Sequence, residues 1–499
     1  RDGYLVLRSF FSREEIEQFP EDLAYRYKVF PVAQTEHSVT LAMADPLNLI
    51  LIDDLKLRLK KEIDMVIAPE GKISELLDKV YKSHEDFFDK IEEQVEDTVQ
   101  VEEGQDLTLG YDALKESEKA PIVKVVDLIL TESLNSRASD IHIEPEEDCV
   151  RVRYRVDGVM YISHTLPKKN QNAILSRLKI MSGLNITETR VPQDGRFKIR
   201  MGKKEVDYRV SSLPTRYGEK FVLRALDKGN LSVGLEKAGF SDVPLTLFQK
   251  ALERPFGIML ITGPTGSGKS TTLYSILNFL NTPERHIITI EDPVEYQVDG
   301  LTQIPINHEI NMTFASALRA VLRQSPDVVM VGEIRDAETA EIAIKASLTG
   351  QFILSTLHTN DSIGAITRLA DMGVEPFLLS SSLVMTSAQR LCRRICPKCR
   401  EPQEVPEHLR QKLGLDPDTV VYHGRGCEAC GNSGYKGREA VLEVLLLDDE
   451  VKDMIVKRAS EGQIAAYARK NLQFRTLRED VMEKCLRGVT TIEEVFRIT

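Results

Sequence analysis

The sequence contains no tryptophan, and aromatic side chains make up only 6% of its 499 residues. It has no apolar run near the roughly 18 residues that cross a bilayer, and no signal peptide opens it. The formal net charge of −12 argues against a general nucleic-acid coat, although a local basic patch fits within that balance. These absences predict a cytosolic protein that neither spans a membrane nor coats nucleic acid.

The most informative segment that is present lies at residues 263–270, which fit the pattern G-x-x-x-x-G-K-[ST]. A short apolar strand pattern at 257–262 precedes it, and a helical pattern at 271–277 follows. In that order, backbone N–H groups of the loop and the helix N-terminus point at a bound anion. Lys269 then reaches the β- and γ-phosphates, and the Ser270 hydroxyl holds Mg²⁺. The alternative is a chance glycine-rich turn, which the flanking strand and helix disfavour, so the segment predicts nucleoside triphosphate binding.

Four of the seven cysteines form two C-x₂-C pairs, Cys396 with Cys399 and Cys427 with Cys430. Each pair presents two thiolates to one ion, and two such pairs complete a closed tetrahedral site. A disulfide or a redox C-x-x-C is the alternative, which a reducing compartment and the pairing of the two motifs disfavour. The spacing therefore predicts a structural zinc ion.

The hydrophobic content of 42% supports packed cores, and the length indicates about three or four domains. The strand and helix patterns and the composition shifts predict six parts: an α/β docking domain at 1–82, an acidic linker at 83–117, a second α/β domain at 118–236, an α/β nucleotide-binding domain at 237–390, a tetracysteine module at 391–440 and a helical domain at 441–499. Because position 1 is Arg rather than Met, we interpret the chain as trimmed at its N-terminus.

Polar residues end the other apolar strands of the nucleotide-binding domain. Residues 287–290 lead into Glu291 and Glu295, residues 328–331 into Glu333, and residues 352–357 into His358. Ligands of open α/β sheets bind beyond the carboxyl ends of strands, so these side chains should converge on the nucleotide. Hydrolysis needs one carboxylate to orient or deprotonate water and another to manage Mg²⁺. Each segment alone reads as a simple strand exit, but together they indicate a hydrolase.

The motifs GPTGSGKS, IEDPVEY (290–296), DVVMVGEIRD (327–336) and STLHTND (355–361) closely resemble those of the secretion ATPases of type II secretion and type IV pilus assembly. The resemblance runs from about residue 120 to the C-terminus and includes the tetracysteine module, SDIHIEP (139–145), RVDGV (155–159) and RVPQDGR (190–196). It implies a RecA-like P-loop core with a PAS-like α/β domain before it, a Cys₄ zinc insert and a C-terminal helical domain. It also implies ATP, Mg²⁺ and Zn²⁺ as cofactors.

The resemblance assigns roles to matching positions. Phosphates are bound by Gly263, Pro264, Thr265, Gly266, Ser267, Gly268, Lys269, Ser270 and Thr271. Glu291 and Glu295 lie in the family's aspartate box, Glu333 in its Walker B, where it is the first choice for activating water, and His358 in its histidine box, where it senses the γ-phosphate. The Walker B strand ends in Gly332, where most P-loop enzymes have the Asp that interacts with Mg²⁺. Glu291 or Glu295 is therefore expected to interact with the Mg²⁺ ion instead.

Arginines supplied across a domain or subunit boundary stabilise growing charge on the transferred phosphoryl group. Arg196, Arg209 and Arg224 lie in segments that resemble those used by the family, and a solvated basic face is the alternative for each. Strict alternation places Arg151, Arg153 and Arg155 together on another strand face.

The resemblance further implies a cytoplasmic homo-hexamer, peripheral on the inner face of the bacterial inner membrane, that moves an inner-membrane platform protein and adds pilin-like subunits to a filament. Residues 1–82 would dock a membrane anchor protein, and acidic phospholipid is a second surface. Having one N-terminal module favours type II secretion over type IV pilus extension. Some relatives bind a cyclic dinucleotide through a doubled module opening on Arg-Leu-Gly, whereas this chain opens on Arg1-Asp2-Gly3, which argues against that activity.

A nucleic-acid motor that grips its substrate through the Cys₄ module is the alternative from a different class. The acidic balance and the lack of aromatic residues interleaved with a basic groove argue against it. A small-molecule kinase fits least, because no segment resembles a substrate lid.

Overall fold

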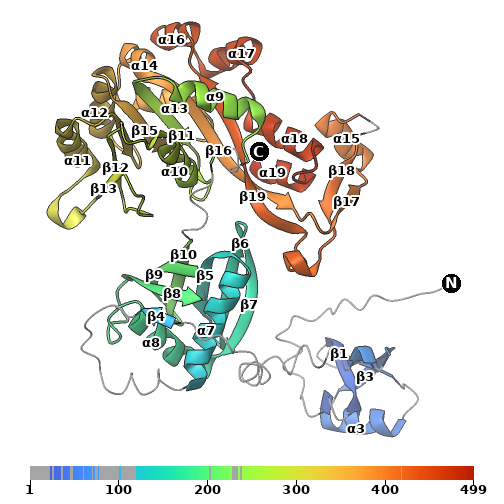
Figure 1. The fold of residues 1–499 in the computed structure, drawn as a ribbon. Helices are drawn as coiled ribbons and strands as arrows, with labels where there is room; N and C mark the ends of the chain where they lie inside the picture. The colour runs from blue at the N-terminus through green and yellow to red at the C-terminus, as the bar shows by residue number, and fades with distance from the viewer. Residues whose placement is uncertain are drawn as a thin grey trace.

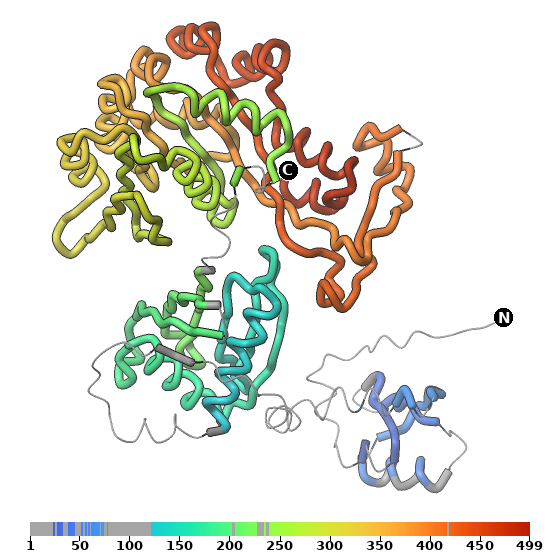
Figure 2. The backbone as a smooth tube through the Cα atoms, viewed as in Figure 1, coloured from blue at the N-terminus to red at the C-terminus, as the bar shows by residue number. Residues whose placement is uncertain are grey.

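The computed structural model describes residues 23–24, 27–34, 38–44, 49–59, 61–69, 71–73, 77, 100–102, 120–201, 204–227, 234–235, 239–416 and 419–499 (Figures 1 and 2). Most of the predicted acidic linker lies outside the described residues. Of the helices in the described part, none combines the length and apolar character that crossing a bilayer requires.

The N-terminal part contains a three-stranded sheet of order β1-β2-β3, with β1–β2 antiparallel and β2–β3 parallel. Its elements are β1 (Val29–Gln34), β2 (Ser38–Met43), α3 (Leu49–Leu59) and β3 (Glu62–Ile67). Buried Leu41 on β2 and Leu55 on α3 share its core, as the α/β pattern of the sequence predicts.

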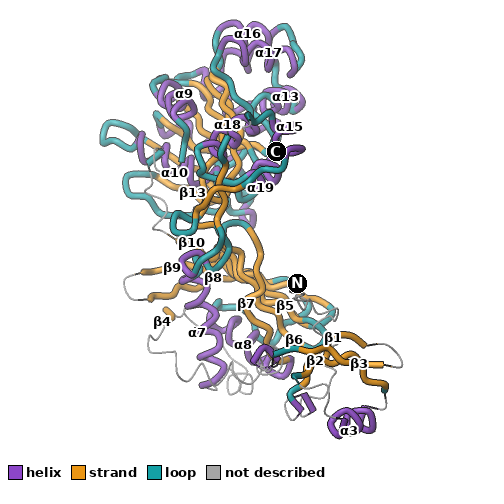
Figure 3. Tube along the Cα trace, turned by 90° about the vertical axis from the view of Figure 1, so that its right-hand side faces the viewer, coloured by secondary structure: helices purple, strands orange, loops and turns teal. Residues whose placement is uncertain are grey.

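The second domain is built on a seven-stranded antiparallel sheet of order β4-β8-β9-β10-β5-β6-β7. Its elements are β4 (Gln100–Glu102), α7 (Ala120–Asn135), β5 (Ala138–Pro145), β6 (Cys149–Val156), β7 (Val159–Pro167), α8 (Gln171–Met181), β8 (Gln193–Met201), β9 (Lys204–Thr215) and β10 (Gly218–Asp227). Helices α7 and α8 cover one face and share its apolar core (Figure 3). The other face carries the charged residues of the alternating strands, including Arg155. Strand β4, inside the predicted linker, pairs with the edge strand β8, a pairing that its sequence does not signal.

The nucleotide-binding domain contains a second seven-stranded sheet, of order β13-β12-β14-β15-β11-β16-β19, parallel except at β19. Its elements are α9 (Asp242–Leu252), β11 (Gly257–Thr262), α10 (Lys269–Leu280), β12 (Ile287–Glu291), β13 (Thr302–Pro305), α11 (Phe314–Val321), β14 (Val328–Val331), α12 (Ala337–Leu348), β15 (Phe352–Leu357), α13 (Gly364–Asp371) and α14 (Pro376–Ser382). Strands β11, β12, β14 and β15 are buried along their whole length, as expected for parallel strands covered on both faces.

Strands β16 (Leu383–Ile395) and β19 (Tyr435–Leu446) extend from this sheet into the tetracysteine module, so the predicted boundaries at 390/391 and 440/441 fall inside strands. Between them lie β17 (Arg400–Gln403), α15 (Glu407–Leu413) and β18 (Val421–Gly424). The chain closes with α16 (Asp449–Val456), α17 (Glu461–Asn471), α18 (Leu477–Leu486) and α19 (Ile492–Ile498).

These last helices pack in pairs on different surfaces. Buried residues of α16 and α17 join the core that α11 to α14 form with one face of the sheet, whereas α9 and α10 cover the other face. Helices α18 and α19 instead share a separate core with β16 and β19. The C-terminus is thereby held beside β16, the neighbour in the sheet of β11, which leads into the nucleotide loop.

Candidate active site

The loop between β11 and α10 has the geometry that phosphate binding needs. Gly268 caps α10 with a left-handed backbone, at φ 87°. A Cβ at this position would lie 2.8 Å from Nε2 of Gln389, so both conformation and space require glycine. The Lys269 ammonium donates to the carbonyls of Gly263, at 2.7 Å, and Pro264, at 3.1 Å. Partial burial lowers the pKa of Lys269, and the facing Glu333 carboxylate opposes that shift.

One cavity of about 960 Å³ adjoins this loop. Its lining combines the loop and helix start, at 264–271, with the carboxyl ends of β12, β14 and β15. Of the predicted residues, Glu291, Glu295, Glu333, His358 and Arg224 line it. The convergence expected from the sheet topology is therefore present in the tertiary structure.

Glu333, directly after β14, contacts two basic side chains in this cavity. Nη2 of Arg335 donates to it at 2.6 Å, and Nε2 of His358, which follows β15, lies 3.2 Å from its other oxygen. Burial alone raises the pKa of the Glu333 carboxyl, but the Arg335 hydrogen bond and charge and the His358 hydrogen bond outweigh it and lower the pKa below its ordinary value. The group is thus held ionised.

Glu291, the last residue of β12, is buried and accepts from three side chains. The Tyr274 hydroxyl of α10 lies 2.6 Å from its Oε2, while the Thr289 hydroxyl, at 2.6 Å, and the Gln303 amide, at 3.2 Å, reach Oε1. Burial and the adjacent Glu291 charge raise the pKa of Tyr274, so its hydroxyl remains a donor. These bonds fix the orientation of Glu291 relative to the helix that begins at the phosphate loop.

Glu295 is linked to the second domain. Nη1 of Arg209, on β9, lies 3.0 Å from Oε2 of Glu295, and Nη2 of the same arginine donates to the Val294 carbonyl at 3.1 Å. An arginine that the sequence singles out therefore contacts the segment that follows β12 directly, within one chain.

The predicted arginines share a row across the second-domain sheet. Cross-strand pairs run from Arg196 to Arg209, from Arg209 to Arg224, from Arg224 to Asp140, and from Asp140 to Arg155. Like charges directly opposite one another destabilise a sheet. Asp140, which pairs with Arg224 at 3.0 Å and Arg155 at 3.3 Å, offsets part of that repulsion. Arg224, Asp140 and Arg155 line the cavity, whereas Arg196 is exposed on β8 and does not belong to the lining.

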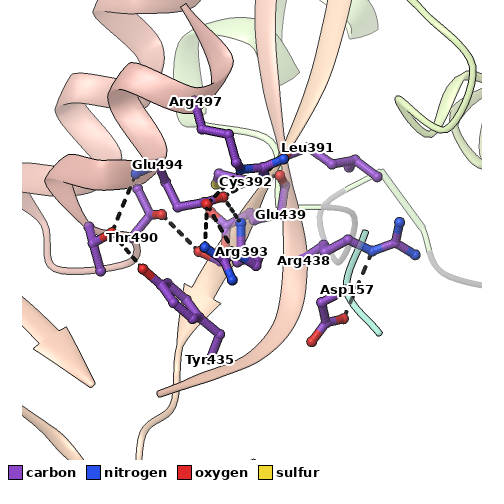
Figure 4. Close-up of polar contacts among 11 residues, drawn as sticks. Asp157, Leu391, Cys392, Arg393, Tyr435, Arg438, Glu439, Thr490, Glu494 and Arg497 are labelled. Atoms are coloured by element: carbon purple, nitrogen blue, oxygen red, sulfur yellow. Dashed lines mark hydrogen bonds and ion pairs between the residues drawn. The ribbon is translucent and has the colours of Figure 1, made fainter. Parts of the chain in front are cut away.

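A second contact between these domains closes another side of the cavity. Asp157, in the β6–β7 turn, accepts from the backbone N–H of Gly437 at 2.9 Å and lies 3.9 Å from Nε of Arg438 (Figure 4). Both residues belong to β19, an edge strand of the sheet. It lies on the other side of β11 from β14, the strand that precedes Glu333.

The Sγ atoms of Cys396, Cys399, Cys427 and Cys430 all lie within 4.8 Å of one another. Individual separations are 3.8 Å between Cys396 and Cys427, 3.9 Å between Cys399 and Cys430, and 3.7 Å between Cys427 and Cys430. Ligands placed about 2.3 Å from zinc at tetrahedral angles are about 3.8 Å apart. These three separations match the spacing of thiolates around one tetrahedral zinc ion.

Several residues at the cavity were not singled out by the sequence as site residues. Those that lie in no motif and still line the cavity include Arg390, Leu391, Arg438, Arg497 and Ile498. Asp140, Arg155 and Asp157 also line it and fall within motifs that carry the resemblance. Gln389 is not among the lining residues, but it bonds to the loop by donating to the Ser267 carbonyl at 3.0 Å, and it accepts from Thr272 of α10 at 2.9 Å.

Comparison with known proteins identifies the same architecture. The family model described as "Type II/IV secretion system protein" matches residues 115–497, and the MshEN domain model matches residues 11–86. The type IV pilus assembly ATPase PilB of Myxococcus xanthus is 46% identical over 486 residues, covering 96% of this chain and 86% of the relative. The type II secretion system ATPase E of Vibrio cholerae is 40% identical over 494 residues, covering 98% and 97%. The solved structure of the pilus retraction motor PilT with bound ADP is 27% identical, with a TM-score of 0.51, covering 74% of this chain and 96% of that one.

Proposed function

The chain belongs to the type II/IV secretion system protein family and is an ATP-hydrolysing P-loop enzyme, and from that premise we propose that it is the motor of type II protein secretion. In this proposal a cytoplasmic hexamer, bound to the inner face of the bacterial inner membrane, drives pseudopilin filament assembly. Its near-complete overlap with a type II secretion ATPase, at 97% of that relative's length, supports this branch.

The observation that carries the proposal is the shared cavity. It joins a phosphate loop, Glu333 with His358, the buried Glu291 and the second-domain Arg224. We assign water activation to Glu333, because it is ionised and lies beside the loop. Bound ATP carries the Mg²⁺ ion, for which the Ser270 hydroxyl is the expected protein ligand.

The second domain supports a motor rather than a simple hydrolase. Arg209 and Asp157 contact the nucleotide-binding domain at two separate places that flank the cavity. A nucleotide bound there reaches both domains, so binding and hydrolysis can change their relative position. Such a change would be transmitted to an inner-membrane platform protein, while residues 1–82 dock a membrane anchor protein. Acidic phospholipid would hold the hexamer at the surface.

Type IV pilus extension is the second candidate. It is favoured by the pilus assembly ATPase of Myxococcus xanthus, which has the higher identity over nearly all of this chain. Deletion of the gene in its source bacterium distinguishes the two. Loss of exoprotein secretion with pili retained supports the type II proposal, and loss of surface pili with secretion retained overturns it.

The activity is tested by phosphate release per chain, measured while enzyme concentration is raised and mass is followed by light scattering. We expect specific activity to rise as hexamers form, because contacts between neighbouring chains then hold the second domain, with Arg209 and Arg224, in place against the cavity. Lys269→Ala should abolish release, while Lys250→Ala, an exposed control on α9, should not. A flat specific activity from monomer to oligomer would overturn the motor proposal.

A further inference from the structure

The order of strands fixes the direction in which ATP lies in the cavity, given the proposed function. Glu291 ends β12, and Glu333 and His358 follow β14 and β15. All three strands lie on one side of the loop strand β11. The γ-phosphate must point to that side to meet them. The nucleoside must therefore lie on the other side, toward β16 and β19.

That end of the cavity is lined by Leu391 of β16, Arg438 of β19, and Arg497 and Ile498 of the terminal helix α19. Leu391 lies against the loop, because a Cβ on Gly268 would be 3.3 Å from its Cδ2. Apolar side chains with a few placed donors are the usual lining of a nucleoside site. Leu391 and Ile498 supply the apolar surface, and the arginines supply the donors.

The Arg497 guanidinium is held in a fixed orientation (Figure 4). Its Nε and Nη2 both donate to Glu494 at 2.6 Å, and Nη2 also donates to the Leu391 carbonyl at 3.1 Å. Among the described residues, its Nη1 has no hydrogen-bond partner. The side chain is 42% exposed, so these remaining donors are available to a ligand.

Glu494 is the centre of this arrangement and is fully buried, at 0% exposure. It also accepts from the backbone N–H and Nε of Arg393, at 2.8 and 2.9 Å. The Arg393 guanidinium stacks on the Tyr435 ring at 3.8 Å, and the Tyr435 hydroxyl lies 2.9 Å from Thr491 on the N-terminal side of α19. A buried carboxylate is tolerated when it is this fully paired, and the pairing restricts its partners to one geometry.

We infer that Arg497 binds the nucleoside part of ATP through Nη1, with Leu391 and Ile498 packing on the base, and that Glu494 is its positioning residue. The proposal deepens the proposed function, since it names the nucleoside contacts of the same site. It gives the last turn of the chain a role in substrate affinity rather than in the chemical step.

The test compares two ligands, ATP and inorganic triphosphate, by equilibrium binding to the full chain. Arg497→Ala should raise the Kd for ATP about tenfold, the size of one charge-assisted hydrogen bond, and leave the Kd for triphosphate within about twofold. KM for ATP should rise with little change in kcat, because the contact is equal in ground and transition states. Arg478→Ala, an exposed arginine on the neighbouring α18, is the matched control.

Glu494→Gln should weaken ATP binding in the same direction, and the double variant should cost no more than Arg497→Ala alone. If Glu494→Gln fails to fold, Arg497→Lys is tested in its place. Lysine keeps the positive charge beside Glu494 but lacks the forked guanidinium donors, so its Kd for ATP should lie between those of the wild type and Arg497→Ala. Equal effects of Arg497→Ala on both ligands, or none on either, would overturn the inference. Failure of the wild type to bind ATP, or retained phosphate release in Lys269→Ala, would instead refute the proposed function.

Discussion

The hydroxyl of Tyr274 lies 2.6 Å from Oε2 of Glu291, joining α10, the helix that begins at the phosphate loop, to the end of β12. Tyr274→Phe keeps the ring and its packing but removes this donor. A hydrogen bond to a charged group contributes about 1.5 to 3 kcal/mol, so we expect kcat to fall roughly 10- to 100-fold. Single-turnover measurements report this fall in rate, and Tyr161→Phe, at an exposed tyrosine on β7, is the control. An unchanged kcat would show that Glu291 needs no orientation from α10.

Glu333→Gln should bind ATP as the wild type does and hydrolyse it about 10² to 10⁴ times more slowly, since only the carboxylate that polarises water is lost. Binding and turnover are measured separately on the same preparation. If binding fails while Glu291→Gln gives the stalled enzyme, the roles of the two carboxylates are exchanged.

The Arg335 contact also predicts a pH effect. Arg335 helps to hold the pKa of Glu333 below its ordinary value, so Arg335→Ala should raise that pKa. The carboxylate is then protonated earlier as the pH falls, and the acid limb of kcat should move to higher pH. Arg285→Ala, an exposed arginine elsewhere in the domain, should leave the limb in place. A limb that does not move in Arg335→Ala would exclude Glu333 as the titrating base.

Arg209→Ala should reduce kcat by about 10³-fold, at the lower end of the range for an arginine finger, while changing the Kd for ATP much less. The side chains of Arg209 and Glu295 are each about a third exposed, so their ion pair contributes little to stability. The midpoint of thermal unfolding of Arg209→Ala should therefore stay close to that of the wild type. Arg216→Ala, exposed near the β9–β10 turn, is the control. A loss confined to binding would mean that Arg209 contacts the ground state only.

Metal analysis of protein purified under reducing conditions should find about one zinc per chain. Cys396→Ser or Cys430→Ser should lose it, and the module should unfold at lower temperature before ATP binding is affected, because the site is closed. Cys149→Ser, in the second domain, should retain the metal. Protein without zinc in the wild type would refute the site.

Much of this site could be predicted from the sequence because its parts are local. The phosphate loop, with the strand before it and the helix after it, is one contiguous segment, and the structure has that order, with α10 beginning at Lys269. The positions of Glu291, Glu333 and His358 follow from a general property of parallel sheets, once the strands are recognised. The cysteine spacing likewise predicts a site whose sulfur separations fit zinc.

The arginine row could not be predicted in the same way. Alternation along β6 gives the face of Arg155, but which residue of another strand lies opposite depends on register, and register is set by the packing of the whole sheet. For that reason Arg224 reaches the cavity and Arg196 does not, although the sequence offers both as equals.

The sequence alone therefore determined the phosphate-loop segment, the polar residues at the strand ends and the paired cysteine motifs, since each depends on neighbours along the chain. Only the tertiary structure decided which distant residues complete the site. Arg497 lies more than 200 residues from Lys269 in the sequence and lines the same cavity. It does so because α18 and α19 pack on β16 and β19, which brings the C-terminus beside the loop strand. Such placement results from long-range burial of apolar surface, which no local pattern records.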